Sequence, residues 1–363
     1  MTNWQLTAAV RGFRPIASLP DGLICHRRGG LYKMSFDLEQ PRLICQLPSA
    51  GFIGAIATRS RTLDRIFRVS PTHGVVVGDT LLIARRSEIW RCSLTSGKLE
   101  LEFVIPDGRR ALSFGLIASQ DGHQEVVFGE YFENFTKEPV RIWGRNDGSA
   151  AWAVRATFQT GEIEHIHAVS MVQDRVLILT GDFGQAAGIW MTDPLFSSLV
   201  PLLRGQQAFR SAWVRELAGR VYFATDTQLD PNHIYELSIG DTSPQVRQIA
   251  AIGGSSIYAS QGRSDIFFST TIECGAPSGK FFKDLLETKP GTGITSSTAS
   301  VMCIDSNGAI SEIFSAEKDF WPFRLAQFGT FTFPAGLLPA DTVVAYGIAL
   351  KGADDTCFVF KKS

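Results

Sequence analysis

The segment GEIEHIHAVSMV, residues 161–172, places two histidines two residues apart at the start of an apolar run. Alternate residues of a β-strand point to the same side, so His165 and His167 would project together. Imidazole nitrogens bind divalent cations and transfer protons near neutral pH. A metal ion such as Mn, Zn or Ca would need a third ligand, for which Glu162, Asp182 or another loop histidine is a candidate. The alternatives are a metal-free functional pair and an ordinary polar turn.

Other polar residues with catalytic potential also stand beside apolar runs. The segments TGDFG and ATDT place Asp182 and Asp226 after two similar runs, and GEYFEN supplies Glu130 and Tyr131. Arg210, in GQQAFRSAW, directly precedes another run, and a planar guanidinium group can hold a carboxylate bidentately. Each residue also has a structural interpretation, because aspartates cap turns, tyrosines pack at rims and arginines form ion pairs in loops.

Histidine, arginine and tyrosine together suit β-elimination from a uronate-containing glycan, the reaction of a polysaccharide lyase. Arg210 or a metal ion would neutralise the carboxylate, which makes the neighbouring carbon more acidic. His165 or His167 would then remove the proton from that carbon, and Tyr131 would protonate the leaving oxygen. In this hypothesis Glu130 and Asp182 are further catalytic candidates, and Asp182 could take part in proton transfer or orient a histidine.

Two further hypotheses remain open at this point. A glycoside hydrolase needs two carboxylates on either side of the scissile bond, and Glu130, Asp182 and Asp226 could supply them. The same scaffold could also be a non-catalytic module that binds a glycan or a protein in polysaccharide biosynthesis. Replacement of His165 by alanine separates these hypotheses, because it would abolish turnover by a lyase and only weaken binding by a module.

The elements that must position these residues are short strands. Apolar runs separated by Gly, Asp, Asn and Pro recur in groups of four, an all-β pattern with a period of about 45 residues. This period predicts a β-propeller with seven blades of four strands each, and six blades is the main alternative. The second strands of the seven repeats are expected to start near Leu23, Leu81, Val126, Val176, Val221, Ile266 and Val343.

The last repeat contains only three recognisable strands. The N-terminal segment Trp4–Arg11 would supply the fourth strand and close the ring, which removes free sheet edges. Residues 1–363 are therefore predicted to form a single domain. Residues 270–300 are expected to be an insertion within a late blade.

One face of the predicted ring collects most of the polar residues. Loops that lead into a first strand, and loops from a second to a third strand, share this face. Five of the six histidines map there, together with many arginines, so the rim would attract acidic ligands. An acidic glycan is the expected partner. The predicted substrate-binding residues are Arg27, Arg85, Arg110, Asp226 and His233.

Composition excludes several classes of protein. The formal net charge is −1, which argues against a nucleic-acid-binding protein with its usual basic excess. No apolar run is long enough for a transmembrane helix, and the N-terminus lacks the features of a secretory signal. The six cysteines are widely spaced, as free core thiols are, so a cytoplasmic protein is expected. The oligomeric state cannot be predicted from these features.

The segment RNDGSAAW resembles the Asp-box of sialidase-like propellers, whose pattern is Ser-x-Asp-x-Gly-x-Thr-Trp. Asp147 and Trp152 match this pattern and Ser149 is an accepted variant, whereas Arg145 and Ala151 depart from it. The Asp-box stabilises a turn away from the catalytic face. The resemblance therefore implies a fold and not an activity.

Two broader resemblances concern carbohydrate-related propellers. Residues 120–240 are similar to propellers that are associated with bacterial polysaccharide genes. The His-x-His spacing resembles that in the metal site of the oligogalacturonate lyases, which are seven-bladed propellers. The ligand pattern around His165 and His167 departs from the one in that family, so the resemblance transfers no residue roles.

Overall fold

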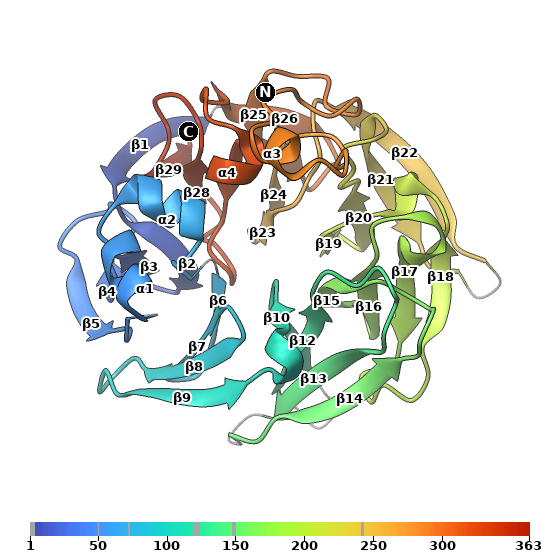
Figure 1. The fold of residues 1–363 in the computed structure, drawn as a ribbon, viewed down its shortest axis with the longest axis horizontal. Helices are drawn as coiled ribbons and strands as arrows, with labels where there is room; N and C mark the ends of the chain where they lie inside the picture. Colours follow the sequence, from blue (N-terminus) through green and yellow to red (C-terminus); the bar gives the residue numbers. More distant parts are fainter. Residues whose placement is uncertain (1–3, 50, 72, 119–123, 147–149, 241–242) are drawn as a thin grey trace.

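The strands of this protein form a closed ring of seven antiparallel sheets around a central axis (Figure 1). Six sheets have four strands, and the seventh has a fifth, short strand at its inner edge. The protein is thus a seven-bladed β-propeller, as predicted, and the six-bladed alternative is wrong. Every second strand begins within two residues of its predicted start. The computed structural model describes residues 4–49, 51–71, 73–118, 124–146, 150–240 and 243–363.

The blades are numbered along the chain, and each begins at the central axis. Blade 1 consists of β2 (Arg14–Leu19), β3 (Gly22–Arg27), β4 (Gly30–Met34) and β5 (Arg42–Gln46). Blade 2 consists of β6 (His73–Val77), β7 (Thr80–Arg85), β8 (Glu88–Ser93) and β9 (Leu99–Val104). Blade 3 consists of β10 (Arg110–Ala111), β11 (Gly115–Ala118), β12 (Gln124–Tyr131), β13 (Val140–Asn146) and β14 (Ala153–Phe158).

The remaining blades follow the same order. Blade 4 consists of β15 (Ile166–Val172), β16 (Arg175–Thr180), β17 (Gly188–Thr192) and β18 (Val200–Arg204). Blade 5 consists of β19 (Val214–Leu217), β20 (Arg220–Ala224), β21 (Asn232–Ser238) and β22 (Gln245–Ile252). Blade 6 consists of β23 (Ala259–Gln261), β24 (Asp265–Ser269), β25 (Thr298–Asp305) and β26 (Ile310–Glu317). Blade 7 consists of β27 (Thr330–Thr332), β28 (Thr342–Ile348), β29 (Thr356–Lys362) and β1 (Trp4–Arg11).

Burial along each blade explains the sequence pattern. Second strands such as β24 and β28 are buried at every residue, because the neighbouring blades cover both of their faces. Their sequences are therefore continuous apolar runs. Outer strands such as β1 alternate between exposed and half-buried residues, because one face meets solvent.

The ring closes between the two ends of the chain. Strand β1 pairs antiparallel with β29, with Trp4 opposite Lys362 and Arg11 opposite Thr356. The Trp4 and Phe267 rings also meet edge to face, at 5.3 Å between centroids, and Phe267 belongs to the neighbouring blade 6. The predicted role of the N-terminal segment is confirmed, because β1 supplies the fourth strand of blade 7.

The helices all lie in two kinds of connection. Helices α1 (Gly51–Ala57), α2 (Arg61–Phe67) and α4 (Phe323–Ala326) connect the last strand of one blade to the first strand of the next. Helix α3 (Phe281–Leu285) lies between the second and third strands of blade 6, within the predicted insertion. Both kinds of connection open on the same face of a propeller. None of the described helices is long enough to cross a membrane.

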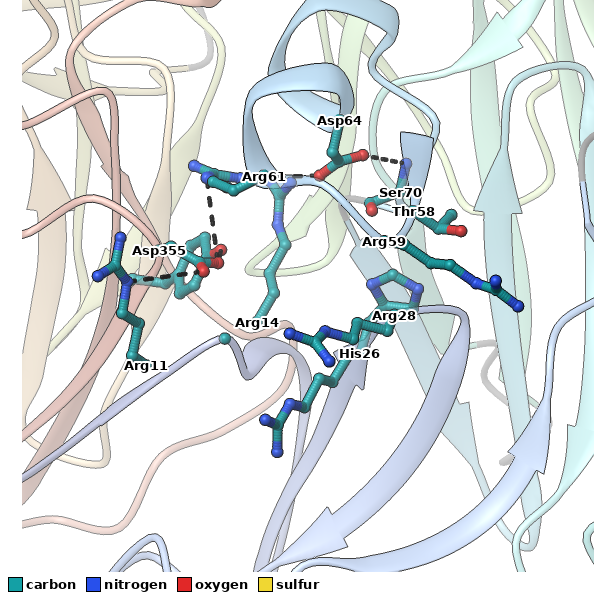
Figure 2. Close-up of a pocket in the computed structure, with 13 residues that line it drawn as sticks. Arg11, Arg14, His26, Arg28, Thr58, Arg59, Arg61, Asp64, Ser70 and Asp355 are labelled. Atoms are coloured by element: carbon teal, nitrogen blue, oxygen red, sulfur yellow. Dashed lines mark hydrogen bonds and ion pairs between the residues drawn. The ribbon is translucent and has the colours of Figure 1, made fainter. Parts of the chain in front are cut away.

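Helices α1 and α2 cover the junction between blades 1 and 7. Arg61 forms an ion pair of 2.6 Å with Asp354, and Figure 2 shows it beside Asp355. Arg65 of α2 donates to the carbonyl oxygen of Ala326 in α4 at 2.9 Å. These charged contacts hold the helices on the face that carries the predicted ligand site. The six cysteines are free, as expected.

Candidate functional site

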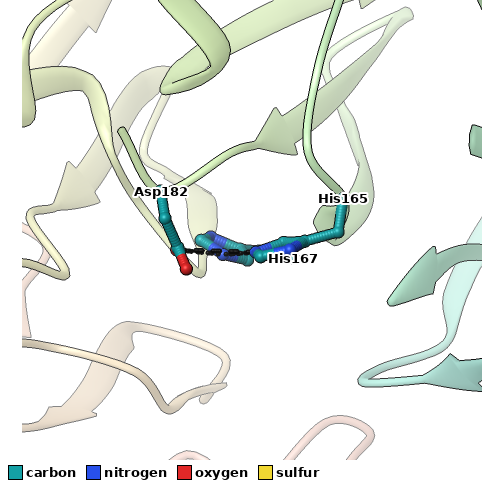
Figure 3. A group of neighbouring side chains, drawn as sticks. All are labelled: His165, His167 and Asp182. Carbon is teal, nitrogen blue, oxygen red and sulfur yellow. Dashed lines mark hydrogen bonds and ion pairs between the residues drawn. The ribbon is translucent and has the colours of Figure 1, made fainter. Parts of the chain in front are cut away.

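Three side chains from blade 4 converge at the mouth of the channel (Figure 3). His165 directly precedes β15, His167 lies within β15, and Asp182 follows β16. The two histidine Nε2 atoms lie 3.0 Å apart. Asp182 Oδ1 lies 3.2 Å from Nε2 of His167 and 3.5 Å from Nε2 of His165. Both imidazole rings are buried, so the group is largely shielded from solvent.

Backbone carbonyls determine which nitrogen of each histidine carries its proton. Nδ1 of His165 lies 3.2 Å from the carbonyl oxygen of Phe132, and Nδ1 of His167 lies 3.0 Å from that of Ser211. A carbonyl oxygen can only accept a hydrogen bond, so each Nδ1 must be the donor. In the neutral rings both Nε2 atoms then present lone pairs, to each other and to a carboxylate oxygen. This arrangement requires a cation between the three atoms, either a proton or a metal ion.

Local backbone features position the three side chains. The ladder between β15 and β16 skips His167, and such a β-bulge redirects side chains at the end of a strand. Gly181 has φ of +86°, and a Cβ atom there would lie 2.0 Å from the carbonyl oxygen of Ala186. Only glycine fits this turn. Glu164 accepts a 2.8 Å hydrogen bond from the backbone N–H of Asp182 and so holds the turn against the histidines.

The donor atoms fit a transition-metal ion. With bonds of about 2.1 Å, neighbouring ligand atoms lie about 3.0 Å apart in an octahedron and about 3.4 Å apart in a tetrahedron. The separations of 3.0 to 3.5 Å among His165, His167 and Asp182 span this interval. Two imidazoles and one carboxylate suit Zn, Mn or Fe(II), whereas Ca prefers ligands that are all oxygen. The hydrogen bonds from each Nδ1 to a carbonyl are the outer contacts that metal-binding histidines usually make.

Glu162 does not belong to this group. Its carboxylate accepts a 2.6 Å hydrogen bond from the backbone N–H of Gln159. Asp182, the alternative third ligand, takes the place that the sequence pattern assigned to Glu162. Glu162 lies in the turn before β15. Its spacing from His165 along the sequence does not determine the direction of its side chain.

The charges in the group stabilise one another. Burial alone would raise the pKa of Asp182, but hydrogen bonds from His165 and His167 and the charge of Arg210 lower it well below its usual range. Burial likewise opposes protonation of His167, but its hydrogen bond to Asp182 and the negative charges of Asp182 and Asp226 together outweigh burial and raise the pKa of His167. Without a metal ion, one proton on Nε2 of His167 can be shared with Nε2 of His165 and Oδ1 of Asp182, so that all three atoms take part in a hydrogen bond.

Arg210 is near the group but its charge is already compensated. Its Nη2 atom lies 3.1 Å from Asp182 Oδ1 and 3.9 Å from Asp226 Oδ2, and its Nη1 atom donates to Gln228 at 2.9 Å. These contacts orient Asp182. They leave Arg210 poorly suited to the predicted role of gripping a substrate carboxylate.

Two buried carboxylates lie beside Arg210. Asp226 follows β20 and Glu273 follows β24, so they occupy similar places in blades 5 and 6. Burial raises the pKa of Glu273 to about 7, and the negative charge of Asp226 adds to this effect. Burial also raises the pKa of Asp226, although the charge of Arg210 opposes it. Oδ1 of Asp226 and Oε1 of Glu273 have no hydrogen-bond partner within the described part of the chain.

Glu273 is a buried carboxylate on the ligand face that no sequence motif marks, although its place in the repeat is a signal for it. Glu273 follows a second strand, as Asp182 and Asp226 do, but the long insertion after it hid this equivalence. An alignment of the repeats by their second strands would have placed it on the ligand face. The segment TTIECG shows no other mark of function.

Replacing Glu273 with glutamine is expected to stabilise the protein above pH 7. An unfolded glutamate ionises near pH 4.3, whereas Glu273 keeps its proton until about pH 7. Wild-type stability therefore falls as the pH rises from about 4 to 7, by about 4 kcal/mol at most. Urea unfolding at pH 4, 6 and 8 would show the variant gaining stability over the wild type only at the higher values. The exposed Glu133→Gln variant should show no such difference, and a constant difference across pH would contradict this pKa.

Tyr131 completes the wall of the site. Its ring lies 4.3 Å from the ring of His165, measured between centroids. Burial, with the negative charges of Asp182 and Asp226, raises the pKa of Tyr131 to about 12. The phenol therefore stays protonated at neutral pH and can donate a proton or hydrogen bond.

Glu130, in contrast, is not accessible to any ligand. Its side chain is fully buried and accepts hydrogen bonds from Arg109 at 2.5 Å and from the Trp143 indole at 3.0 Å. The Nε atom of Arg141 lies 3.1 Å from it. Glu130 neutralises arginines inside blade 3, and these contacts favour a structural role over the predicted catalytic one.

The predicted substrate-binding residues separate into engaged and available groups. Arg85 is buried and donates to Glu88 at 2.8 Å, so it is not free to bind substrate. Arg27 stacks on the Phe13 ring at 4.5 Å and lines a different cavity. His233 is the second residue of β21, a third strand, and among the described residues it makes no hydrogen bond or ring contact with His165 or His167.

Arg110 belongs to a cationic pocket on the channel side of the ligand face. The pocket measures about 530 Å³ and is lined by four arginines, with no carboxylate among its described lining residues. The charge of Arg110 lowers the pKa of Tyr131, which packs on His165, so the pocket and the histidine group act on the same tyrosine. We call it the arginine pocket, and its charged residues are Arg68, Arg86, Arg110 and Arg324.

Comparisons with known proteins identify the fold. No family model matches the chain, and no curated protein matches it. An oligogalacturonate lyase in complex with manganese superposes with a TM-score of 0.56 at 9% identity, covering 100% of this chain and 99% of that chain. The oligogalacturonate lyase of Vibrio parahaemolyticus gives a TM-score of 0.56 at 8% identity, covering 99% and 97%. A chain of the mitotic checkpoint complex gives 0.54 at 9% identity, covering 99% and 94%. At such low identity these similarities establish the propeller alone.

The Asp-box resemblance gains no support from these comparisons, because no family model matches. Asp147 and Ser149 lie outside the described residues. Arg145 and Trp152 both donate to Glu102 of the neighbouring blade, at 2.7 Å and 2.9 Å. The segment thus ties blade 3 to blade 2.

Proposed function

We propose that this protein is a metal-dependent lyase that cleaves an acidic, uronate-containing oligosaccharide or polysaccharide by β-elimination. The observation that carries this proposal is the convergence of two imidazole Nε2 atoms and one carboxylate oxygen within 3.0 to 3.5 Å. The Nδ1 protons are committed to backbone carbonyls, so the two Nε2 lone pairs face each other and Asp182 Oδ1 with no donor between them unless a proton or a metal ion is bound. A divalent ion bound by His165, His167 and Asp182 would supply a Lewis acid that neutralises a substrate carboxylate.

The arginine pocket supports an acidic substrate. Its guanidinium groups are not compensated by carboxylates among the residues that line it. Burial, together with the charges of Arg110 and Arg324, lowers the pKa of Arg68, which shows that these like charges disfavour one another. A bound anion would relieve this repulsion. The carboxylate-binding role that was predicted for Arg210 therefore passes to Arg68 and Arg110.

Proton transfer also requires a different assignment from the sequence hypothesis. A histidine whose Nε2 holds a metal ion cannot act as a base. Glu273 is partly ionised near pH 7, so it can accept the proton from the carbon next to the substrate carboxylate. The electron pair then forms the carbon–carbon double bond as the glycosidic carbon–oxygen bond breaks. Tyr131 can donate its proton to the leaving oxygen, because its phenol is protonated.

The similarity to oligogalacturonate lyases is consistent with this proposal. One of these neighbours was solved in complex with manganese, an ion that the His-His-Asp group of this chain also fits. The checkpoint-complex neighbour shows that the same fold also occurs in unrelated assemblies. The site of this chain, rather than its fold, is the reason for preferring an enzyme.

A glycoside hydrolase is the second candidate, and one observation favours it. Asp226 and Glu273 are two buried carboxylates with raised pKa values, and each has an unpartnered oxygen within the described residues. Pairs of carboxylates with such shifted pKa values serve as the acid and base in glycoside hydrolysis. Glu130, which the sequence offered as one carboxylate of such a pair, instead forms ion pairs with arginines inside blade 3.

An absorbance assay at about 235 nm tests the lyase proposal, because unsaturated uronates absorb there. Purified protein with one equivalent of Mn or Zn should produce a rising signal on a uronate-containing oligosaccharide panel. EDTA should abolish the signal, and added metal should restore it. The rate should increase as the pH rises through about 7, the pKa of Glu273.

Other outcomes of this assay would reject the lyase. New reducing ends without absorbance would favour the hydrolase. A flat trace on every substrate, with saturable glycan binding by the metal-loaded protein, would favour a non-catalytic glycan-binding propeller.

A further inference from the structure

A second cavity lies at the junction of blades 7 and 1, beneath helices α1 and α2 (Figure 2). It measures about 350 Å³, and six arginines and two aspartates line it. Its residues come from β1, β2, β3, β28 and the α1–α2 segment. None of them belongs to the histidine group, which blade 4 carries on the other side of the ring (Figure 1).

Arg14 is the central observation in this cavity. It begins β2, and its side chain is 5% exposed. Its Nε atom has no hydrogen-bond partner within the described chain, and no ion pair to it is found there. Its guanidinium carbon lies 5.6 Å from the centre of the Tyr346 ring. A buried guanidinium without a carboxylate is costly, so the protein gains if an anion is bound there.

The two aspartates of the cavity are already engaged. Asp355 accepts a 2.6 Å hydrogen bond from the hydroxyl group of Tyr346 and lies 4.0 Å from Arg61. Asp64 accepts a 3.0 Å hydrogen bond from the backbone N–H of Ser70 and lies 3.7 Å from Arg61. Both carboxylates thus lie in ion-pair contact with Arg61, and neither forms an ion pair with Arg14.

Two exposed arginines add further positive charge. Arg28 occupies the β3–β4 turn with φ of 48°, and Arg59 lies between α1 and α2. Neither forms an ion pair within the described residues, and both side chains line the cavity. Guanidinium groups on three separate segments therefore surround one space.

His26 contributes a neutral donor to the same cavity. Its Nε2 atom accepts a 3.1 Å hydrogen bond from the backbone N–H of Gly29, so its Nδ1 atom carries the proton. Burial and the charges of Arg14 and Arg85 lower the pKa of His26 to about 3. A neutral N–H beside several guanidinium groups suits an oxyanion better than a metal ion.

We propose that this cavity is a second ligand site, formed by Arg14, Arg28, Arg59 and His26, which binds a small oxyanion group such as a carboxylate, a sulfate or a phosphate. The proposal does not depend on the metal site or on the lyase reaction. The α1–α2 segment would then help to form this site, because it places Arg59 over the cavity and carries Arg61, which pairs with both aspartates.

Titration with three probes tests the proposal and identifies the oxyanion class. Glucuronate, inorganic sulfate and inorganic phosphate are each titrated by calorimetry at constant ionic strength, and the ring signals of His26 are followed by NMR. At least one probe should bind saturably and shift the His26 signals. Glucuronate alone would indicate an acidic sugar, and phosphate or sulfate alone would indicate an esterified ligand.

The variants make the test specific. Arg28→Ala combined with Arg59→Ala removes exposed side chains, so the fold should survive while probe affinity falls at least about tenfold. The matched control combines Arg175→Ala with Arg263→Ala, two exposed arginines on the opposite face, and should bind as the wild type does. His167→Ala should retain anion binding even if it loses metal, which separates this site from the proposed function. The proposal is overturned if no probe binds the wild type, or if the Arg28/Arg59 variant binds as tightly as the control.

Discussion

The His167→Ala variant is expected to lose tight binding of Mn or Zn and all metal-dependent turnover. His167 supplies one of only three ligand atoms in the group, and its Nε2 atom contacts both of the others. Loss of an outer contact to a metal ligand typically costs 10- to 100-fold in affinity, so loss of the ligand should cost more than about 100-fold. Calorimetric titration of the metal-free protein with each ion measures this directly.

The chain offers a close control for this experiment. His233 lies on the same face but outside the group, so His233→Ala should bind metal as the wild type does. Asp182→Asn should weaken binding as His167→Ala does, since the amide carries no charge. Equal metal affinity in His167→Ala and His233→Ala would show that the two histidine Nε2 atoms and the Asp182 oxygen bind a proton and no metal ion.

Metal affinity in the wild type should also depend on pH in a definite direction. The pKa of His167 is raised, so at a slightly acidic pH its Nε2 atom carries a proton that competes with the ion. Affinity should therefore fall as the pH drops through this pKa, and the midpoint should lie above the usual value of about 6.5. Release of a proton on metal binding, seen as a buffer-dependent heat, would support this exchange.

The Glu130→Gln variant is expected to lose much of its stability without a direct effect on the site. Glu130 is the buried counter-charge of Arg109 and is also contacted by Arg141 and Trp143. Removing one partner of a buried ion pair leaves an uncompensated charge and costs about 3 to 5 kcal/mol. The midpoint of denaturant unfolding should decrease clearly relative to the wild type.

Glu138→Gln is the matched control, because Glu138 also contacts Arg109, at 3.4 Å, but its side chain is 61% exposed. An exposed pair contributes at most about 1 kcal/mol, so this variant should unfold close to the wild type. If Glu130→Gln kept wild-type stability but lost turnover, Glu130 would have to be returned to the catalytic residues.

The comparison of Glu130 with Tyr131 shows where sequence reasoning about the site reached its limit. They are neighbours in β12, so their side chains point to opposite sides of the strand. One side faces the arginines within the sheet and the other faces His165. The sequence motif placed both residues at the rim, but only the packing of blade 3 decided which of them reaches the channel.

The arginines show the same limit, because the sequence does not reveal which of them are paired with a carboxylate. Arg85, Arg109 and Arg210 each meet a carboxylate in the folded protein, so they are not free for substrate. Arg14, Arg68 and Arg110 have no such partner within the described chain. An arginine in a loop looks alike in either case, because the sequence does not show whether a carboxylate meets it within its own blade, as Glu88 meets Arg85, or from a neighbouring blade, as Asp182 meets Arg210.

The amino-acid sequence by itself determined the ring. Strand length, strand burial and turn chemistry are local properties, and their repetition with a period of about 45 residues sets seven blades and the N-terminal closure. It also determined that His165 and His167 stand together, since two positions of one strand share a side. Only the tertiary structure decided that Asp182 joins them in place of Glu162, and that Glu273 Oε1 and Arg14 Nε are buried without a hydrogen-bond partner among the described residues. The first depends on how two loops of blade 4 meet and the second on how neighbouring blades pack, and neither follows from spacing along the chain.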